Sequence, residues 1–521
     1  METNPQFSKL RNLLWPIAAF ELRKFIPMVV MIFLIAANYN ILKIIKDSTV
    51  IPAAGAEVIP FIKVWMLLPM AVVVTAFFSY LVQKFNENKA FYIVIGAFLF
   101  YFGVFVFLIY PNRETFYLDT VANFMEGVLP SGLKGLASLV RYWHLCLFYT
   151  MCEIWGTTVL FVLFWGFANR ITVLHEAKRF YALFGLAGNS SGIVAPLFFN
   201  WASSASFLPE AYLKTQWEQS LAVVCFGVLL SGFITIGIFY YLNRFILVKS
   251  ETASATQQTV SSTKKKKERK SFLESMKIMS KDPYVRNLTI VVLSYNIVIN
   301  LTEVLWKAQI KSLYPNQLEY GLYFGKVMMV TGVIATLSDL LLCSNVIRKF
   351  GWTCAAMVTP MILLVTSIGF FGFLMFDSYF ESFLVHLLGM TPLAMTTLFG
   401  SMQNALSRAA KYSLFDATKE ISYIPLDAQS RIQAKAAIDG VCSRLGKSGG
   451  SIVYQCLLGF CGSLTACVPY VAAIVGSLMF FWISAVSSMG KKFKMLTEHQ
   501  AQDDHSDCPS AEPLPKDAVT P

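Results

Sequence analysis

Charged residues are scarce in this sequence. Asp, Glu, Lys and Arg together make up 14% of its 521 residues, whereas soluble globular proteins carry about 25%. This shortage argues against a soluble cytosolic enzyme.

Motifs for metal binding, disulfide formation and catalysis are also lacking. The ten cysteines are scattered, with no CxxC spacing and no histidine cluster nearby, and most lie in apolar runs where cysteine acts as a small buried hydrophobe. Gly446-Lys447-Ser448 resembles the end of a P-loop, but the first glycine of that motif should stand at position 441, which is Val441. There is no HExxH, and no GxSxG or GxGxxG follows a strand pattern. We therefore expect free thiols, no metal and no enzymatic activity.

Long apolar runs dominate the sequence instead. Hydrophobic residues make up 56% of the chain, and the mean hydropathy is +0.56. A membrane-spanning helix needs about 20 mostly apolar residues. Twelve runs meet this description, at 26–45, 60–83, 91–110, 142–168, 181–201, 219–246, 286–306, 321–346, 353–375, 382–402, 436–461 and 466–488. They predict an all-α polytopic membrane protein of about twelve transmembrane helices, with both termini on one side.

The distribution of basic residues predicts which side that is. Lys and Arg outnumber Asp and Glu by 43 to 31, a net charge of +12. On a soluble chain this excess would suggest nucleic-acid binding, but on a membrane protein it is first explained by basic cytoplasmic loops. The densest run, Lys264–Lys270, lies between the sixth and seventh spans. We expect cytoplasmic termini, a topogenic linker and no nucleic-acid partner, although the run could also bind anionic lipid.

The linker divides the chain into two halves. The sequence predicts a cytoplasmic N-terminal segment (1–25), an N-terminal six-helix bundle (26–246), a cytoplasmic basic linker (247–285), a C-terminal six-helix bundle (286–488) and a cytoplasmic polar tail (489–521). Tyr39-Asn40-Ile41 recurs at Tyr295-Asn296-Ile297, and 186–194 resembles 445–453, at offsets of 256 and 259 residues. Two parallel six-helix repeats are typical of major-facilitator transporters, which bind substrate near the midplane between the halves.

Four charged residues lie deep inside the predicted spans. Lys63 is in the second span, and Glu153 is in the fourth. Glu303 is in the seventh, and Lys447 is in the eleventh. A charge at a helix centre costs roughly 2.5–3.5 kcal/mol on insertion scales, so such residues usually face a cavity and serve a function. We predict that these four bind substrate, with structural salt bridges as the alternative.

Other polar residues lie in or next to the predicted spans, and eight form a second rank of candidates. These are Asn40, Lys43, Lys46, Asn296, Asn300, Lys435, Asp439 and Arg444. Lys46, Asp47, Lys307 and Lys435 lie near predicted span ends, where ion pairs or snorkelling would explain them equally well. The lysines predict an electropositive cavity for a polyanion. The glutamates would then be gate partners of these lysines, or acceptors for base or ribose donors.

Several short blocks together resemble a known family. They are Ile59–Trp65, Glu153–Gly156, Phe164–Asn169, Glu176–Tyr181, Lys411–Asp416, Tyr423–Asp427 and Lys435–Asp439. With them the chain is similar, over nearly its whole length, to the ATP/ADP translocase family of non-mitochondrial nucleotide transporters in plastids and intracellular bacteria. The resemblance implies a twelve-helix exchanger that moves nucleotides without a cofactor. It also implies that Lys63, Glu153, Glu303 and Lys447 are functionally important.

One departure from the family concerns the first span. The family pattern usually reads Asn-Tyr-x-x-Leu-Arg-x-x-Lys-Asp, and here Lys43 replaces the Arg. Arg offers a planar fork to phosphate whereas Lys is a point charge, so the preferred nucleotide stays open. The leading hypothesis is import of ATP or another nucleotide in exchange for ADP or another nucleotide.

Two other hypotheses remain. One is proton-coupled net import, with Glu153 or Glu303 carrying the proton. A non-transporting membrane scaffold is a remote third. No removable signal or transit peptide is visible in 1–25, which favours a bacterial inner-membrane protein. Nothing in the sequence demands more than a monomer.

Overall fold

The computed structural model describes residues 17–204, 215–247, 282–341, 343–426, 431, 434–435 and 437–506. The predicted basic run Lys264–Lys270 lies outside these residues. All regular elements of the described residues are helical, as expected for a chain in lipid, where a helix satisfies its own backbone polar groups.

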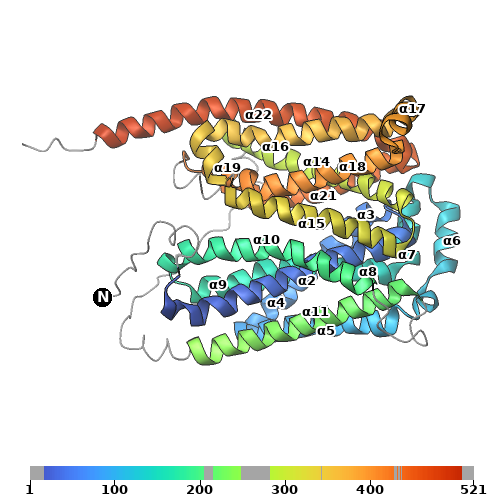
Figure 1. The fold of residues 1–521 in the computed structure, drawn as a ribbon, viewed down its shortest axis with the longest axis horizontal. Coiled ribbons are helices and arrows are strands. Elements are labelled where there is room, and N and C mark those ends of the chain that lie inside the picture. The colour runs from blue at the N-terminus through green and yellow to red at the C-terminus, as the bar shows by residue number, and fades with distance from the viewer. Residues whose placement is uncertain are drawn as a thin grey trace, which may run out of the picture.

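The helices before the linker form the N half. They are η1 (Ala19–Glu21), α2 (Leu22–Ala54), α3 (Val58–Phe61), η2 (Ile62–Leu67), α4 (Leu68–Lys84), α5 (Glu87–Val104), η3 (Phe105–Ile109), η4 (Arg113–Phe116), α6 (Asp119–Val128), η5 (Ser131–Leu133), α7 (Lys134–Arg141), α8 (Trp143–Trp155), η6 (Gly156–Phe164), α9 (Trp165–Ile171), α10 (Leu174–Ser204), α11 (Gln216–Tyr241) and η7 (Leu242–Leu247). Figure 1 shows them as one bundle, coloured from blue to green.

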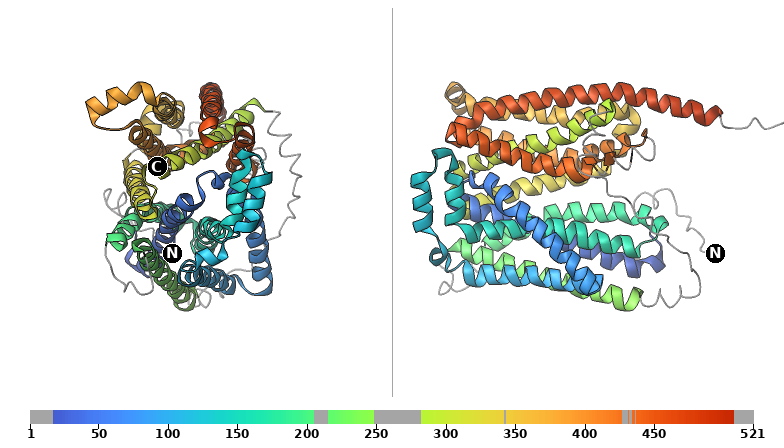
Figure 2. Two further views of the ribbon diagram at one scale, coloured as in Figure 1. Left: turned by 90° about the vertical axis from the view of Figure 1, so that its right-hand side faces the viewer. Right: turned by 180° about the vertical axis from the view of Figure 1, so that it is seen from behind.

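The helices after the linker form the C half. They are α14 (Pro283–Leu313), α15 (Gln317–Leu341), α16 (Cys343–Met375), α17 (Asp377–Leu388), α18 (Pro392–Ala410), η8 (Lys411–Phe415), α19 (Asp416–Ser422), η9 (Ile438–Cys442), α21 (Ser443–Cys461) and α22 (Leu464–Ser506). This second bundle lies beside the first, and the end-on view separates the two (Figure 2).

Ten helices among the described residues are long and apolar enough to cross a membrane, and a bent pair raises this number to eleven. The eleventh predicted span corresponds to η9 and α21, which lie within the bundle but are more polar. The prediction of a polytopic, all-α protein in two halves is confirmed. The tenth predicted span (382–402) was wrong, because two helices meet there at 87°. Gly389 ends α17 with φ 64 and Pro392 starts α18, as a left-handed C-terminal glycine and an N-terminal proline do.

The bundle has two distinguishable ends. The short helices α3, α6, α7 and α17 gather at one end, which we call the α7 end (Figure 1). The start of α2 and the far end of α22 lie with α19 at the opposite end, which we call the α19 end.

Helices α10 and α15 line the boundary between the halves (Figure 1). Gly192 of α10 and Gly332 of α15 touch backbone to backbone, since a Cβ built on Gly332 would lie 2.7 Å from the Gly192 carbonyl carbon. Small residues of this kind let membrane helices approach closely.

Two central helices extend further than their apolar runs predicted. Helix α2 continues to Ala54 and α14 to Leu313, beyond the predicted ends at 45 and 306. Lys46, Asp47 and Lys307 therefore lie inside helices, each with a side chain about 2% exposed. The sequence placed them at span ends because their segments are polar, but packing against the opposite half covers them.

Candidate substrate site

Charged side chains from both halves converge where α2, η2 and α8 meet α14 and α18. We call them the central cluster: Lys43, Lys46, Lys63, Lys307 and Arg408, with Asp47, Glu153 and Glu303. Five cations thus face three carboxylates, which leaves an excess of two positive charges among the described groups. Because charge is expensive inside a membrane, this cluster is the candidate functional site.

Lys46 of α2 holds the N-half side of the cluster. Its ammonium lies 2.9 Å from Asp47 Oδ1 and 3.1 Å from Glu153 Oε1. It also lies 3.7 Å from the centre of the Tyr149 ring, a cation–π contact. Lys46 is therefore fully engaged within its own half.

Lys307 of α14 joins the two halves. Its ammonium lies 2.9 Å from Asp47 Oδ2, across the boundary, and 3.0 Å from Glu303 Oε1 one turn earlier on its own helix. All three residues lie in the interior of the bundle, and Lys307 and Asp47 are the most deeply buried.

Two further cations hold Glu303 more loosely. Lys63 Nζ lies 3.7 Å from Glu303 Oε2, and Arg408 Nη2 lies 3.4 Å from Glu303 Oε1. Their side chains remain 18% and 22% exposed. Longer distances and greater exposure make these two cations easier to transfer to another anion than Lys46 and Lys307.

Lys63 also lies in a widened stretch of helix. Residues Ile62–Leu67 are π-helical, and Glu153 lies just before a second π-helical stretch, Gly156–Phe164. Such bulges are frequent at functional sites because they redirect side chains.

Two asparagines make equivalent contacts in the two halves. Asn40 Nδ2 donates to Ser191 Oγ at 2.9 Å, and Asn300 Nδ2 donates to Ser451 Oγ at 3.2 Å. Asn300 follows Asn40 by 260 positions, and Ser451 follows Ser191 by the same number. The repeat expected from the sequence is thus visible in the contacts, with Asn300 rather than Asn296 as the counterpart of Asn40.

Asn300 additionally connects the halves. Its Oδ1 accepts from Lys63 Nζ at 3.1 Å, and its amide donates to the backbone carbonyl of Lys447. Asn296 donates to Val292 O of its own helix and packs against Gly446. Asn300, one of the second-rank candidates, therefore lies beside the central cluster.

Lys43 and Tyr39 form the edge of the cluster on α2. The Lys43 ammonium lies 4.0 Å from the centre of the Tyr39 ring, and the other ring edge rests on Gly156, where a Cβ would collide with it. This arrangement leaves Lys43 half-buried, within electrostatic range of Glu153 and Glu303.

The remaining predicted residues lie at different distances from the cluster. The Lys447 side chain is exposed on α21, one turn from Gly450, whose backbone contacts Asn300. Lys435 pairs with Glu420 and Asp439 with Lys419, at 2.5 and 2.8 Å. The structure therefore does not bring these two residues into the central cluster. The Arg444 side chain lies outside the described residues.

One member of the cluster was not predicted from the sequence, and three were placed at span ends although they are central, namely Lys46, Asp47 and Lys307. Arg408 fell between the predicted spans, because the tenth was placed at 382–402, whereas α18 runs to Ala410. Asn404, Ser407 and Arg408 at helical spacing were the available signal.

The α7 end of the boundary is joined by hydrogen bonds. Tyr110 donates to Gln317 Oε1 at 3.0 Å and accepts from Trp217 Nε1 at 2.8 Å. Gln317 Nε2 in turn donates to the backbone carbonyl of Thr49 at 3.3 Å.

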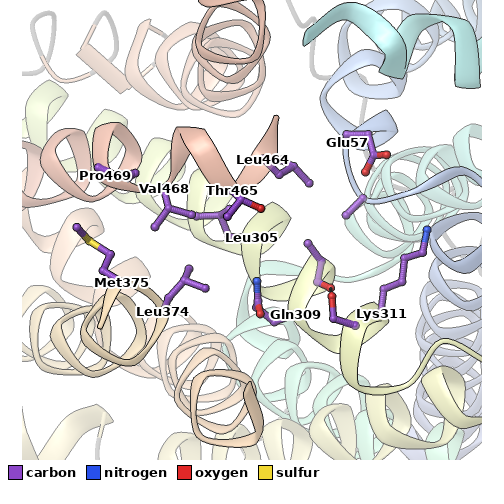
Figure 3. Close-up of a pocket in the computed structure, with 13 residues that line it drawn as sticks. Glu57, Leu305, Gln309, Lys311, Leu374, Met375, Leu464, Thr465, Val468 and Pro469 are labelled. Atoms are coloured by element: carbon purple, nitrogen blue, oxygen red, sulfur yellow. Dashed lines mark hydrogen bonds between the residues drawn. The ribbon is translucent and has the colours of Figure 1, made fainter. Parts of the chain in front are cut away.

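A cavity of about 430 Å³ lies at the same end (Figure 3). Ala56 and Glu57 of the N half line it together with parts of α14, α16 and α22. Its lining is mostly apolar, and Glu57 and Lys311 give it one acid and one base. It therefore lacks the cationic excess of the central cluster.

Comparison with known proteins connects this geometry to a family. Residues 1–493 match the TLC ATP/ADP transporter family. ADP,ATP carrier protein 1 of Chlamydia pneumoniae is 38% identical over 489 residues, 94% of each chain. The chloroplastic ADP,ATP carrier protein 2 of Arabidopsis thaliana is 38% identical over 485 residues, which cover 92% of this chain and 76% of that protein.

Among solved structures, a bacterial homologue of the iron transporter ferroportin in an inward-facing state has a similar fold. The TM-score is 0.54, over 91% of this chain and 99% of that chain. At 12% identity the likeness concerns the fold alone, and it agrees with the transporter architecture expected from the sequence.

Proposed function

The chain belongs to the TLC ATP/ADP transporter family, and from this premise we propose that it imports ATP or another nucleotide across a membrane, in exchange for ADP or another nucleotide. The two halves would rock around a midplane site by alternating access. The observation that carries this proposal is the excess of two positive charges in the central cluster, because a polyphosphate supplies the missing negative charge.

Lys63, Arg408 and Lys447 are the proposed phosphate contacts. Lys63 and Arg408 already bind an oxyanion, Glu303, at distances that allow exchange. Lys447 is exposed on the neighbouring helix. Glu153 and Glu303 are then the partners that hold the lysines while no phosphate is bound.

The asparagines and Lys43 complete the proposed site. Asn40, Asn300 and Asn296 offer amide donors and acceptors of the kind that recognise a base or ribose. Lys43, beside the Tyr39 ring, adds a point charge for a phosphate.

Exchange is favoured over proton-coupled import by the pairing of the two carboxylates. Glu153 lies 3.1 Å from Lys46, and Glu303 contacts Lys307 and two further cations. Both glutamates are thus engaged as counter-ions, and a cycle that protonated either would leave Asp47 as the remaining carboxylate for the two buried lysines, Lys46 and Lys307.

The proposed setting is the inner membrane of a bacterium, with the protein acting as a monomer. The α19 end would face the cytoplasm, because basic residues such as Lys419 of α19 and Lys492 in the far part of α22 lie there. The domain limits expected from the sequence, with the linker 247–285 between the bundles, remain part of this proposal.

Competition for transport tests which cargo is carried. Uptake of labelled ATP into proteoliposomes should be reduced by unlabelled nucleotides in the order of their affinity, among ATP, ADP, GTP, UTP, CTP and NAD. Transport that persists after deletion of 251–263 would also rule against a scaffold built on the linker.

A further inference from the structure

We propose that the ion pair between Asp47 and Lys307 is a separable latch, which holds the two halves together on the α7 side of the substrate site. This proposal rests on the alternating-access transport proposed above. It assigns to the pair a positioning role between the halves rather than contact with substrate.

The position of the latch follows from the repeat. Lys307 follows Asp47 by 260 positions, the same spacing that relates Asn300 to Asn40. Residues at equivalent positions of two related halves can touch only close to the axis that relates the halves. The latch therefore lies on the central axis, one helical turn nearer the α7 end than Glu303.

Each partner of the latch keeps a counter-ion in its own half. Asp47 Oδ1 lies 2.9 Å from Lys46 Nζ on α2, and Lys307 Nζ lies 3.0 Å from Glu303 Oε1 on α14. Breaking a buried ion pair is normally costly because it leaves an uncompensated charge. Here neither charge is left alone when the halves separate, so the pair can open and close within a transport cycle.

Opening at the latch would also separate the contacts around it, among them the hydrogen bond from Gln317 Nε2 to the Thr49 carbonyl at 3.3 Å. Next to the latch, Ser48 is buried against Gly321 of α15, where a Cβ would lie 2.9 Å from Ser48 Oγ. Further towards the α7 end, the cavity between Glu57 and α14 reduces the contact that must be broken (Figure 3).

Glu303 connects the latch to the substrate site. It holds Lys307 together with Lys63 and Arg408. When a phosphate binds Lys63 and Arg408, these two cations no longer pair with Glu303. Glu303 then pairs with Lys307. Lys307 is then drawn towards Glu303 and its hold on Asp47 weakens, so that substrate binding favours opening at the α7 end.

The test measures opening without any nucleotide. A cysteine is introduced as Ser48→Cys, a conservative change at a side chain that is 0% exposed, in a background with serine at the cysteines that are not buried. The purified protein in lipid nanodiscs is treated with a polar maleimide, and the rate of labelling is recorded. The same background without Ser48→Cys is the blank.

Loss of either latch charge should expose the probe. Lys307→Met and Asp47→Asn should each raise the labelling rate by about tenfold, which corresponds to about 1.4 kcal/mol. The double variant should be labelled no faster than either single variant, because each single change already removes the ion pair between Asp47 and Lys307. Lys307→Arg keeps the charge and should label at the parent rate.

Controls separate opening from unfolding. Lys419→Gln breaks an ion pair within the C half and should leave labelling unchanged. Each charge variant is also made in the blank, which lacks Ser48→Cys. A variant that fails to fold would expose the buried Cys146 and Cys152, and the blank would then be labelled. Labelling of Lys307→Met and Asp47→Asn at the parent rate would overturn the latch.

A second arm distinguishes failure of the latch from failure of the proposed function. ATP added to the parent protein should raise labelling of the Ser48→Cys probe. If both charge variants expose the probe but no nucleotide is transported or changes labelling, the latch stands and the proposed cargo is wrong. If the parent exchanges nucleotides while labelling is unchanged in the charge variants, the latch is wrong and the proposed function stands.

Discussion

Lys63 of the N half and Glu303 of the C half face each other across the boundary, with Nζ 3.7 Å from Oε2. At this distance, and partly exposed, the pair is weaker than the buried contacts of Lys46 and Lys307 around it. The cluster therefore contains both firmly held and transferable cations, which is the property that a carrier of anions needs.

Removal of Lys63 should impair uptake strongly. Hydrogen bonds to charged groups contribute about 1.5–3 kcal/mol, so Lys63→Ala should lower the uptake efficiency of labelled ATP by roughly tenfold or more. Uptake by proteoliposomes containing equal amounts of protein measures this.

The matched control is Lys264→Ala in the linker, which should transport at the parent rate. Equal losses in the two variants would mean that the central cluster is not the substrate site. Lys447→Ala should resemble Lys63→Ala if both contact phosphate.

Neutralising Glu303 should separate binding from turnover. Glu303→Gln removes the anion that competes for Lys63 and Arg408, so the apparent KM for nucleotide should fall or stay constant. The maximal exchange rate should fall by about tenfold or more, because the cations are no longer recaptured when phosphate leaves. A rise in KM at an unchanged maximal rate would argue against the role of Glu303 as a switchable partner.

Arg408 should not tolerate replacement by lysine. Its guanidinium can donate two parallel hydrogen bonds to a phosphate, whereas lysine offers a point charge. Arg408→Lys should therefore reduce the affinity for nucleotide by several-fold, and Arg408→Ala by more, as measured by competition with labelled ATP. Full activity of Arg408→Lys would indicate that charge alone matters at this position.

The glycine contact between α10 and α15 should be sensitive to one added methyl group. A Cβ on Gly332 meets backbone at 2.7 Å, so Gly332→Ala should destabilise the protein by about 1–3 kcal/mol and lower its thermal midpoint in detergent. Gly188 of α10 has open space at its Cβ position. Gly188→Ala should leave the thermal midpoint unchanged or raise it slightly. Equal changes of the midpoint in Gly332→Ala and Gly188→Ala would contradict the close contact between α10 and α15.

The fold could be predicted largely because hydrophobicity determines it. Apolar runs located most of the long helices. They failed where the end of a helix is polar yet covered by protein, as at the ends of α2 and α14. Hydrophobicity also did not predict the bend between α17 and α18 at Gly389 and Pro392, because the apolar residues continue through it.

The site was predictable only where a charge interrupts an apolar run. Lys63, Glu153 and Glu303 were found in this way, and the structure places all three in the central cluster. The pairing of Asp47 with Lys307 depends on how the halves meet, which no local pattern encodes. Arg408 was missed because it follows a span whose end was misplaced.

Exchange of nucleotides by this chain can be measured as counter-exchange across a vesicle membrane. Proteoliposomes containing the purified protein are loaded with ADP or left empty, and the initial uptake of labelled ATP is measured in both. We expect rapid uptake into loaded vesicles, much slower uptake into empty ones, and loss of both with Lys63→Ala. Absence of flux with ATP, ADP, GTP, UTP, CTP and NAD, whatever the internal load, would contradict nucleotide exchange.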